Sequence, residues 1–334
     1  MEAGWGMDLS ELSVLITGGT GSFGRALVRH LVDHRRPRRV IVFSRDELKQ
    51  HEMQRTQGFT DPSIRYFIGD VRDKQRLYRA MHGVDIVIHA AAMKQVPACE
   101  YNPLEAVKTN IDGASNVIDA AIDNRVKRVM AISTDKAVNP VNLYGATKLV
   151  AEKLFVQGNS YAGGGVTRFS CARYGNVLGS RGSVIPLFKK QRESGNITIT
   201  DRRMTRFWLT LTQAVEFVST SIDMMQGGEI FVPRIPSMRL VDLAHAVAPE
   251  CAVQEIGIRP GEKLHEILVS KDESRNTRET VDRFIIEPQF PWWTERATVE
   301  GNRMTPETEF ASDTNSLWLS EDELKALAES SDHG

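Results

Sequence analysis

Five side chains near the middle of the chain have types and spacing suited to acid–base chemistry on an alcohol: Thr134, Asp135, Lys136, Tyr144 and Lys148. Tyr144 and Lys148 are four residues apart, which places them on one face of a helix. A phenol ordinarily has a pKa of about 10, so it accepts a proton near neutral pH only if a cation lies close by. We therefore predict that Tyr144, with Lys148 beside it and Thr134 at a strand end, takes the proton of a substrate hydroxyl.

Asp135 and Lys136 extend this chemistry to a second carbon. If a sugar C4 hydroxyl is oxidised to a ketone, the hydrogen on C5 becomes acidic, so a base can remove it while an acid helps the C6 hydroxyl to leave as water. Asp135 as the acid and Lys136 as the base match this need. Lys136 must then be neutral, which requires burial or a neighbouring positive charge to lower its pKa. On spacing alone, an Asp135 that caps a helix and a Lys136 that faces solvent explain the pattern equally well.

A glycine-rich loop follows the first apolar run of the chain. Gly18, Gly21 and Gly24 form the pattern GxxGxxG at the start of a helix expected near Ser22. Glycines allow the backbone to approach a pyrophosphate, whose charge is attracted by the free N–H groups and the dipole of the helix. We interpret the loop as the binding site of a nicotinamide dinucleotide, whose oxidised ring would add its positive charge to that of Lys148. A tight strand–helix turn without a ligand is the alternative.

Three further strand ends complete this cofactor site. Arg45 ends the second strand, where an NAD-specific protein usually has an acidic residue; an arginine accommodates a 2′-phosphate, so we predict NADP. Asp70-Val71 follows the third strand and suits an adenine contact, and three alanines at 90–92 leave room for the cofactor after the fourth. A solvated Arg45 and ordinary strand ends are the alternative.

Short apolar runs alternate with amphipathic segments up to about Tyr174. The runs are SVLIT, RRVIVF, IRYFI, VDIVIHA, KRVMAIS and TRFSCARY. Continuous apolar strands separated by helices predict an α/β fold with a Rossmann-type, doubly wound parallel sheet covered on both faces. After Tyr174 the pattern is irregular and rich in Gly, Ser and Pro, which indicates a smaller substrate-binding region. We assign residues 1–12 to an N-terminal extension, 13–175 to the cofactor domain, 176–294 mainly to the substrate-binding region with some segments returning to the cofactor domain, and 295–334 to a tail with a short helix.

Composition and charge exclude several classes of protein. The 334 residues are 41% hydrophobic, and Lys+Arg 42 against Asp+Glu 43 gives a net charge of −1, so we expect neither nucleic acid nor a membrane as a partner. Three scattered cysteines without CxxC spacing fit a reducing compartment and no zinc. His30 and His34 have metal-ligand spacing, but their basic neighbours indicate a solvated helix end, so we predict no metal. Because no apolar run reaches about 18–20 residues and no signal peptide is evident, we expect a cytoplasmic protein.

A set of motifs extends over nearly the whole chain: ITGGTGSFG, SRDELKQ, FIGDVRD, HAAAMKQVP, EYNPLEAVKTNIDGASN, STDKAVNPVNLYGATK, RYGNVLGSRGSVIP, RMTRFW, GGEIFVPRIPSM, IRPGEKLHE and LWLSEDEL. In these motifs the chain resembles the inverting UDP-N-acetylglucosamine 4,6-dehydratases, which are extended short-chain dehydrogenases/reductases. In the sugar-nucleotide dehydratases that retain the C5 configuration, the residue after the aspartate is usually glutamate. Lys136 is therefore the feature of the inverting group.

The resemblance implies a complete reaction on UDP-N-acetylglucosamine. Tyr144, polarised by Lys148 and helped by Thr134, would take the O4 proton while hydride passes from C4 to a tightly bound NADP. Lys136 would then remove H5, Asp135 would assist departure of the C6 hydroxyl, and the hydride would return to C6. Reprotonation of C5 from the opposite face would give UDP-2-acetamido-2,6-dideoxy-β-L-arabino-hexos-4-ulose.

The resemblance also implies binding residues and an assembly. The residues for the cofactor are Gly18, Thr20, Gly21, Ser22, Phe23, Gly24, Ser44, Arg45, Asp46, Lys49, Asp70, Val71, Ala90, Lys94, Asn110, Tyr144 and Lys148. The residues for the substrate are Lys94, Lys136, Asn176, Arg206, Arg259 and Glu262. Of these, Arg206 and Arg259 suit a diphosphate because a guanidinium binds it in bidentate fashion. Family members are oligomers, so a homo-oligomer, from dimer to hexamer, is expected; the pair Trp292-Trp293 fits either a subunit contact or packing on the substrate-binding region.

Two other functions fit parts of this pattern. An epimerase acting at C5 or C4 of another UDP-sugar would use the same residues if water is never lost, although a C4 epimerase needs no base at C5. A catalytically silent NADP-binding or scaffold protein is the second, and the joint presence of all five candidate catalytic residues argues against it. The motifs leave the pathway open between pseudaminic acid, another deoxyaminosugar and a nucleoside antibiotic.

Overall fold

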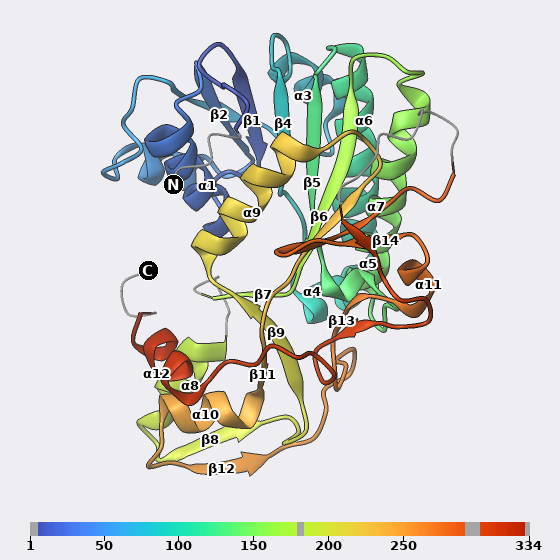
Figure 1. The fold of residues 1–334 in the computed structure, drawn as a ribbon. Helices are drawn as coiled ribbons and strands as arrows, with labels where there is room; N and C mark the ends of the chain where they lie inside the picture. The colour runs from blue at the N-terminus through green and yellow to red at the C-terminus, as the bar shows by residue number, and fades with distance from the viewer. Residues whose placement is uncertain (1–5, 179–183, 291–300, 331–334) are drawn as a thin grey trace.

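A large mixed sheet forms the body of the protein and a smaller cap lies against its carboxyl edge (Figure 1). The structure is a computed structural model that describes residues 6–178, 184–290 and 301–330. The pair Trp292-Trp293 lies outside these ranges. In the described part of the chain, the strands of the main sheet run in the order β16-β14-β15-β10-β6-β5-β4-β1-β2-β3.

The helices and strands have the following bounds. The helices are α1 (Ser22–His30), α2 (Glu47–Gln54), α3 (Lys74–Ala80), α4 (Val96–Tyr101), α5 (Pro103–Val107), α6 (Gly113–Asp123), α7 (Leu143–Tyr161), α8 (Val184–Arg192), α9 (Leu211–Met224), α10 (Leu240–Val247), α11 (Lys271–Ser274) and α12 (Glu321–Ser330), with π-helical η1 (Leu31–Arg35) and η2 (Lys108–Asp112) and a 3-10 turn η3 (Asp135–Ala137). The strands of the main sheet are β1 (Ser13–Thr17), β2 (Arg39–Ser44), β3 (Ile64–Ile68), β4 (Ile86–His89), β5 (Arg128–Thr134), β6 (Arg168–Tyr174), β10 (Ile230–Pro233), β14 (Thr277–Glu279), β15 (Arg283–Ile286) and β16 (Asn302–Arg303). The remaining strands are β7 (Asn176–Val177), β8 (Asn196–Ile199), β9 (Thr205–Leu209), β11 (Ser237–Arg239), β12 (Ala252–Glu255), β13 (Ile267–Val269) and β17 (Phe310–Ala311).

The strands from β10 to β3 pair in parallel, which confirms the predicted α/β fold with a parallel sheet. The six predicted apolar runs form β1 to β6, because strands covered by helices on both faces bury nearly every side chain. Helices α1 and α9 pack together on one face, and α3, α6 and α7 cover the other. Strands β15, β14 and β16 extend the sheet in antiparallel pairing, so segments far beyond Tyr174 belong to the body.

The cap has a core of its own. Parallel strands β8 and β12 pair with each other, and α8, α10 and α12 pack around them. The buried side chains of this core include Ile185 and Phe188 on α8, Leu243 on α10 and Leu324 on α12, together with Trp208 of β9. No helix in the described ranges combines the length and the apolarity that crossing a bilayer requires.

A buried ion network ties the sheet to the segment that leads into the cap. The guanidinium of Arg173 on β6, only 1% exposed, lies 2.7 Å from Glu152 on α7 and 2.8 Å from Glu273 on α11. It also donates to the carbonyl of Leu268 on β13 at 2.9 Å. A buried charge is tolerated only when it is paired, so removal of one partner is costly.

We predict that Arg173→Met lowers the free energy of unfolding by about 3–5 kcal/mol, because it leaves the Glu152 carboxylate buried without its cation. Chemical denaturation followed by circular dichroism measures the change. Arg275→Met is the matched control, since this exposed arginine pairs with the exposed Glu307 at the surface and its loss should cost less than about 1 kcal/mol. Equal effects of the two variants would contradict the prediction.

Candidate active site

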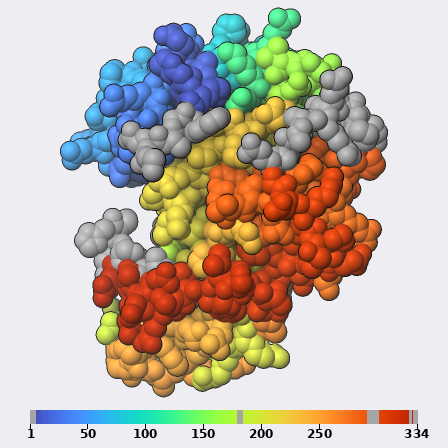
Figure 2. Space-filling model, in the orientation of Figure 1, coloured from blue at the N-terminus to red at the C-terminus, as the bar shows by residue number. Residues whose placement is uncertain are grey.

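A cleft of about 1060 Å³ lies between the carboxyl edge of the sheet and the cap. Figure 2 shows the surface hollowed at this level, between the blue N-terminal part and the red C-terminal helix. The predicted site residues that line the cleft are Gly18, Thr20, Gly21, Ser22, Phe23, Gly24, Ser44, Arg45, Asp46, Lys49, Val71, Ala90, Lys94, Thr134, Lys136, Tyr144, Lys148, Asn176, Arg206, Arg259 and Glu262. Asp70, Asn110 and Asp135 are not among the lining residues. The cleft is large enough for a dinucleotide and a second ligand.

The glycine loop forms a close cradle at the end of β1. Gly18 has a left-handed backbone (φ 70°), and a Cβ there would lie 2.9 Å from the backbone of Ala91. A Cβ on Gly24 would lie 2.6 Å from the carbonyl oxygen of Gly18. Helix α1 begins at Ser22 with Gly21 as its N-cap, and within the described ranges no side-chain cap bonds to its first N–H groups. Bare backbone donors at a helix N-terminus fit the pyrophosphate of a dinucleotide.

Polar side chains at the ends of β2 and β3 border the outer part of the cleft. Arg45 is 57% exposed on its side chain, and its guanidinium lies 3.7 Å from Asp70. Asp70 also binds Arg72 at 2.7 Å, so its carboxylate already serves two arginines. Asp46 caps α2 by accepting from the backbone N–H of Lys49 at 3.0 Å. The exposed guanidinium of Arg45 is thus held beside the cleft by a carboxylate.

Asn110 supports the wall of the cleft from behind. It lies in the π-helical segment η2, and its amide accepts from the N–H of Met93 at 2.8 Å and donates to the carbonyl of Met93 at 2.9 Å. The same amide nitrogen donates to Thr147 at 2.9 Å. These bonds fix the segment after β4 against α7, so Asn110 acts on the cleft through the backbone of Met93.

Asp135 and Lys136 face the same pocket because they occupy the 3-10 turn η3, directly after β5. Asp135 is fully buried, and its Oδ1 accepts from the hydroxyl of Thr134 at 2.8 Å and from Nζ of Lys136 at 3.0 Å. Lys136 Nζ also lies 3.4 Å from Oδ1 of Asn176 and 3.5 Å from Glu266. Asp135 is therefore neither solvated nor a helix cap, and Lys136, 26% exposed on its side chain, lies between this buried carboxylate and the cleft.

The charges around Lys136 favour its ammonium form. Burial alone would lower its pKa, but the carboxylates of Asp135 and Glu266 outweigh burial and raise the pKa above the ordinary value for lysine. Arg206 opposes them. A neutral Lys136, which the chemistry at C5 requires, therefore has to give up its proton against two carboxylates.

Tyr144 and Lys148 lie on α7, one turn apart. Burial raises the pKa of Tyr144 to about 12, and the ammonium of Lys136 and a hydrogen bond from Thr134 oppose the rise. Lys148 donates to the carbonyl of Ile132 at 2.6 Å, and burial lowers its pKa. The ammonium of Lys136 is thus a cation that acts on the phenol and that the sequence pattern did not assign to this role.

The predicted diphosphate ligands differ in how accessible they are. Arg206 is 8% exposed, and its two terminal nitrogens donate to the carbonyls of Thr205, Lys263 and Leu264 and to the sulfur of Met204. A diphosphate can therefore bind Arg206 directly only by displacing these partners. Arg259 is exposed and lies 4.0 Å from Glu262.

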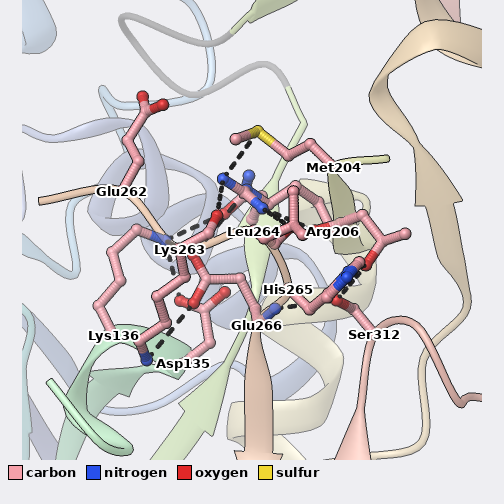
Figure 3. Close-up of polar contacts among 12 residues, drawn as sticks. Asp135, Lys136, Met204, Arg206, Glu262, Lys263, Leu264, His265, Glu266 and Ser312 are labelled. Atoms are coloured by element: carbon pink, nitrogen blue, oxygen red, sulfur yellow. Dashed lines mark hydrogen bonds and ion pairs between the residues drawn. The ribbon is translucent and has the colours of Figure 1, made fainter. Parts of the chain in front are cut away.

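Two further charged side chains enter the site from the segment before β13, and sequence reasoning did not single them out. Glu266 is 2% exposed, and Lys263 lies 3.7 Å from it (Figure 3). Lys263 also donates to the carbonyl of Val138, two residues after Lys136. A signal was present in the sequence: Glu266 directly precedes the buried run Ile267–Val269, where a charged side chain calls for a partner.

Comparisons with known proteins agree with this geometry. The model of a family described as "Polysaccharide biosynthesis protein" matches residues 14–288. Two curated relatives from Campylobacter jejuni strains, both named "UDP-N-acetylglucosamine 4,6-dehydratase (inverting)", are 54% and 53% identical over 94% and 93% of this chain and 96% of their own. "UDP-glucose 4-epimerase" of Rickettsia massiliae is 42% identical over 83% of each chain.

Solved structures extend the similarity to the fold. Pen from Bacillus thuringiensis superposes with a TM-score of 0.89 at 40% identity, covering 98% of this chain and 99% of its own. DesIV, a dTDP-glucose 4,6-dehydratase from Streptomyces venezuelae solved with NAD and TYD bound, has a TM-score of 0.67 at 22% identity and covers 76% of this chain, which shows a shared fold. The chain therefore belongs to the polysaccharide biosynthesis protein family, in the group of extended short-chain dehydrogenases/reductases that contains the inverting UDP-N-acetylglucosamine 4,6-dehydratases.

Proposed function

We propose that the protein is an NADP-dependent UDP-N-acetylglucosamine 4,6-dehydratase that inverts the configuration at C5. The observation that carries the proposal is the pair Asp135–Lys136, in which a buried carboxylate lies 3.0 Å from the amine of Lys136, and this lysine lines the cleft together with Tyr144. The names of the relatives at 53–54% identity support the same substrate and outcome. The proposal also includes a cytoplasmic homo-oligomer, from dimer to hexamer.

The cofactor would lie along the glycine cradle, with Arg45 beside its 2′-phosphate. An arginine suits this group because its planar guanidinium binds a phosphate through two parallel bonds. When bound, the dinucleotide would supply reversible hydride transfer between the sugar and its nicotinamide ring, so the reaction would need no other oxidant or reductant. Gly18 and Gly24 fit it because their missing Cβ atoms keep the backbone open at the helix N-terminus.

The residues of the chain move the protons. Tyr144 takes the proton of the C4 hydroxyl, assisted by Thr134, and Lys136 takes the proton of C5. Asp135 gives a proton to the C6 hydroxyl, which leaves as water, and C5 receives a proton from the face opposite Lys136. Two protons leave the sugar and two are supplied to it. The C5 proton comes from water, and Tyr144 returns the proton it gained to water, so the charge of the site is restored before the next turnover.

The central test is the reaction itself. Purified protein incubated with UDP-N-acetylglucosamine in heavy water should yield the 4-keto-6-deoxy sugar nucleotide with deuterium at C5 and inverted C5 configuration, as read by NMR. A product that retains the C5 configuration, or the lack of any 4-keto-6-deoxy product, would refute the proposal.

We predict that Lys136→Met slows formation of the 4-keto-6-deoxy product by at least about 100-fold, because general-base catalysis typically contributes that much. Deuterium incorporation at C5 should fall by the same factor. Lys108→Met is the matched control: this exposed lysine pairs with Glu105 at the surface and should leave the rate unchanged. Unaltered turnover of Lys136→Met would exclude this lysine as the base.

We predict that Arg45→Ala weakens the binding of NADP by at least about tenfold and leaves the binding of NAD unchanged, because only NADP carries the 2′-phosphate. Isothermal titration calorimetry with both dinucleotides measures the difference. Equal losses for NAD and NADP would show that Arg45 acts on the loop rather than on the phosphate.

A C4 epimerase of a UDP-sugar is the second candidate, favoured by the name of the Rickettsia relatives at 42–43% identity. It would release no water and would not incorporate deuterium at C5. The NMR experiment above separates the two, since epimerisation at C4 changes the sugar without forming a C6 methyl group.

A further inference from the structure

Glu266 is a buried carboxylate that the proposed reaction does not use. It directly precedes β13, and its backbone is held on both sides by Ser312: its N–H donates to the Ser312 hydroxyl at 2.9 Å, and its carbonyl accepts from the Ser312 N–H at 2.8 Å. The side chain is 2% exposed and points from the segment before β13 toward η3 (Figure 3). Its position is therefore set by the fold.

Three cations from three parts of the chain surround this carboxylate. Oε1 lies 3.5 Å from Nζ of Lys136 on η3 and 3.9 Å from Nε of Arg206 on β9, and Oε2 lies 3.7 Å from Nζ of Lys263. Oε2 has no hydrogen-bond partner within the described residues. Glu262, on the same segment, points away from this cluster in Figure 3. Glu266 is thus the carboxylate shared by the candidate base and two other cations.

The charges facing Lys136 can be counted element by element. Asp135 lies beside Lys136 on η3. Glu266 and Lys263 approach it from the segment before β13. Arg206 approaches from β9, and the phenol of Tyr144 approaches from α7. Two carboxylates against three cations leave one positive charge in excess. Transfer of one proton from Lys136 to Asp135 stays within the cluster and leaves this excess unchanged, whereas loss of Glu266 would leave three cations around one carboxylate.

We propose that Glu266 is a positioning residue for Lys136: its carboxylate holds the amine at the cleft against the repulsion of Arg206 and Lys263, and it sets how readily Lys136 passes its proton to Asp135. The proposal rests on the proposed function, in which Lys136 is the base at C5. The proton moves along the 3.0 Å contact from Nζ to Oδ1, so that one N–H bond breaks and one O–H bond forms.

This single transfer prepares both groups for the elimination. Lys136 gains the lone pair that accepts H5, and Asp135 gains the proton that the C6 hydroxyl needs to leave as water. After the elimination Lys136 is again an ammonium and Asp135 again a carboxylate, so the pair returns to its starting charge. Glu266 opposes the transfer, because it attracts the Lys136 proton, and it also supplies the fixed charge that keeps the three cations together.

The test uses two variants that separate charge from shape. Glu266→Gln keeps the shape and removes the charge, and Glu266→Asp keeps the charge on a shorter side chain. Single-turnover formation of the 4-keto-6-deoxy product from UDP-N-acetylglucosamine is followed by NMR between about pH 6 and pH 11. Because the proton passes within the pair, the rate stays level while Lys136 is an ammonium and Asp135 a carboxylate. It falls at high pH, where Lys136 loses its proton to the solvent and Asp135 no longer receives the proton that the C6 hydroxyl needs.

In Glu266→Gln the falling limb should move to lower pH by about one unit or more, which is a tenfold change in proton affinity, while the rate on the plateau falls because Nζ loses its anchor. Glu266→Asp should keep the limb near that of the wild type. Ser312→Ala loosens the backbone of the same segment without changing its charge, so it should lower the melting temperature and leave the limb in place.

A limb that does not move in a folded Glu266→Gln protein would overturn the inference and leave Glu266 with a structural role. If Glu266→Gln does not fold, Lys263→Gln provides the opposite test: removing a cation that competes for Glu266 should move the limb to higher pH, and a limb that stays in place or falls would again overturn it. Wild-type protein that incorporates no deuterium at C5 would instead refute the proposed function.

Discussion

Two buried carboxylates and three cations meet at the junction between the sheet and the cap, and their charges have to be paired within that small volume. Asp135 and Lys136 follow β5, Arg206 belongs to β9, and Lys263 and Glu266 precede β13. Because an unpaired buried charge costs several kcal/mol, each segment keeps the others in place. The cap is fixed to the sheet at the point where the reacting atoms of a substrate would lie, so the same contacts serve folding and chemistry.

The local geometry of η3 explains how two adjacent residues act in one pocket. Neighbouring side chains on a strand point to opposite faces, so Asp135 and Lys136 would diverge if β5 continued. At Asp135 the chain turns into a 3-10 helix, in which three residues complete one turn. Neighbouring side chains are then about 120° apart instead of on opposite faces. The carboxylate then lies beneath the amine and bonds to it, and the dipeptide can supply both an acid and a base to one sugar.

Much of the body could be predicted from the sequence because the patterns that specify strands and the loops after them lie within short stretches of the chain. Continuous apolar runs identified β1 to β6, and the carboxyl ends of parallel strands gather at one edge, which is why nearly all predicted site residues line one cleft. The exceptions depend on tertiary contacts. Asp70 is engaged by two arginines, and Asn110 bonds to the backbone of Met93. Glu266 belongs to the site only because β13 packs beside η3, a contact that no local pattern encodes.

The charged cluster also bears on the choice between the two candidate reactions. Epimerisation at C4 moves one proton on and off O4, for which Tyr144 suffices. A buried ion cluster contributes little net stability, and apolar side chains of similar volume would often stabilise the fold as well or better. An epimerase would therefore gain nothing from Asp135, Lys136 and Glu266 beside its tyrosine. A dehydratase needs an acid and a base within reach of C5 and C6, and one proton passed between Asp135 and Lys136 provides both.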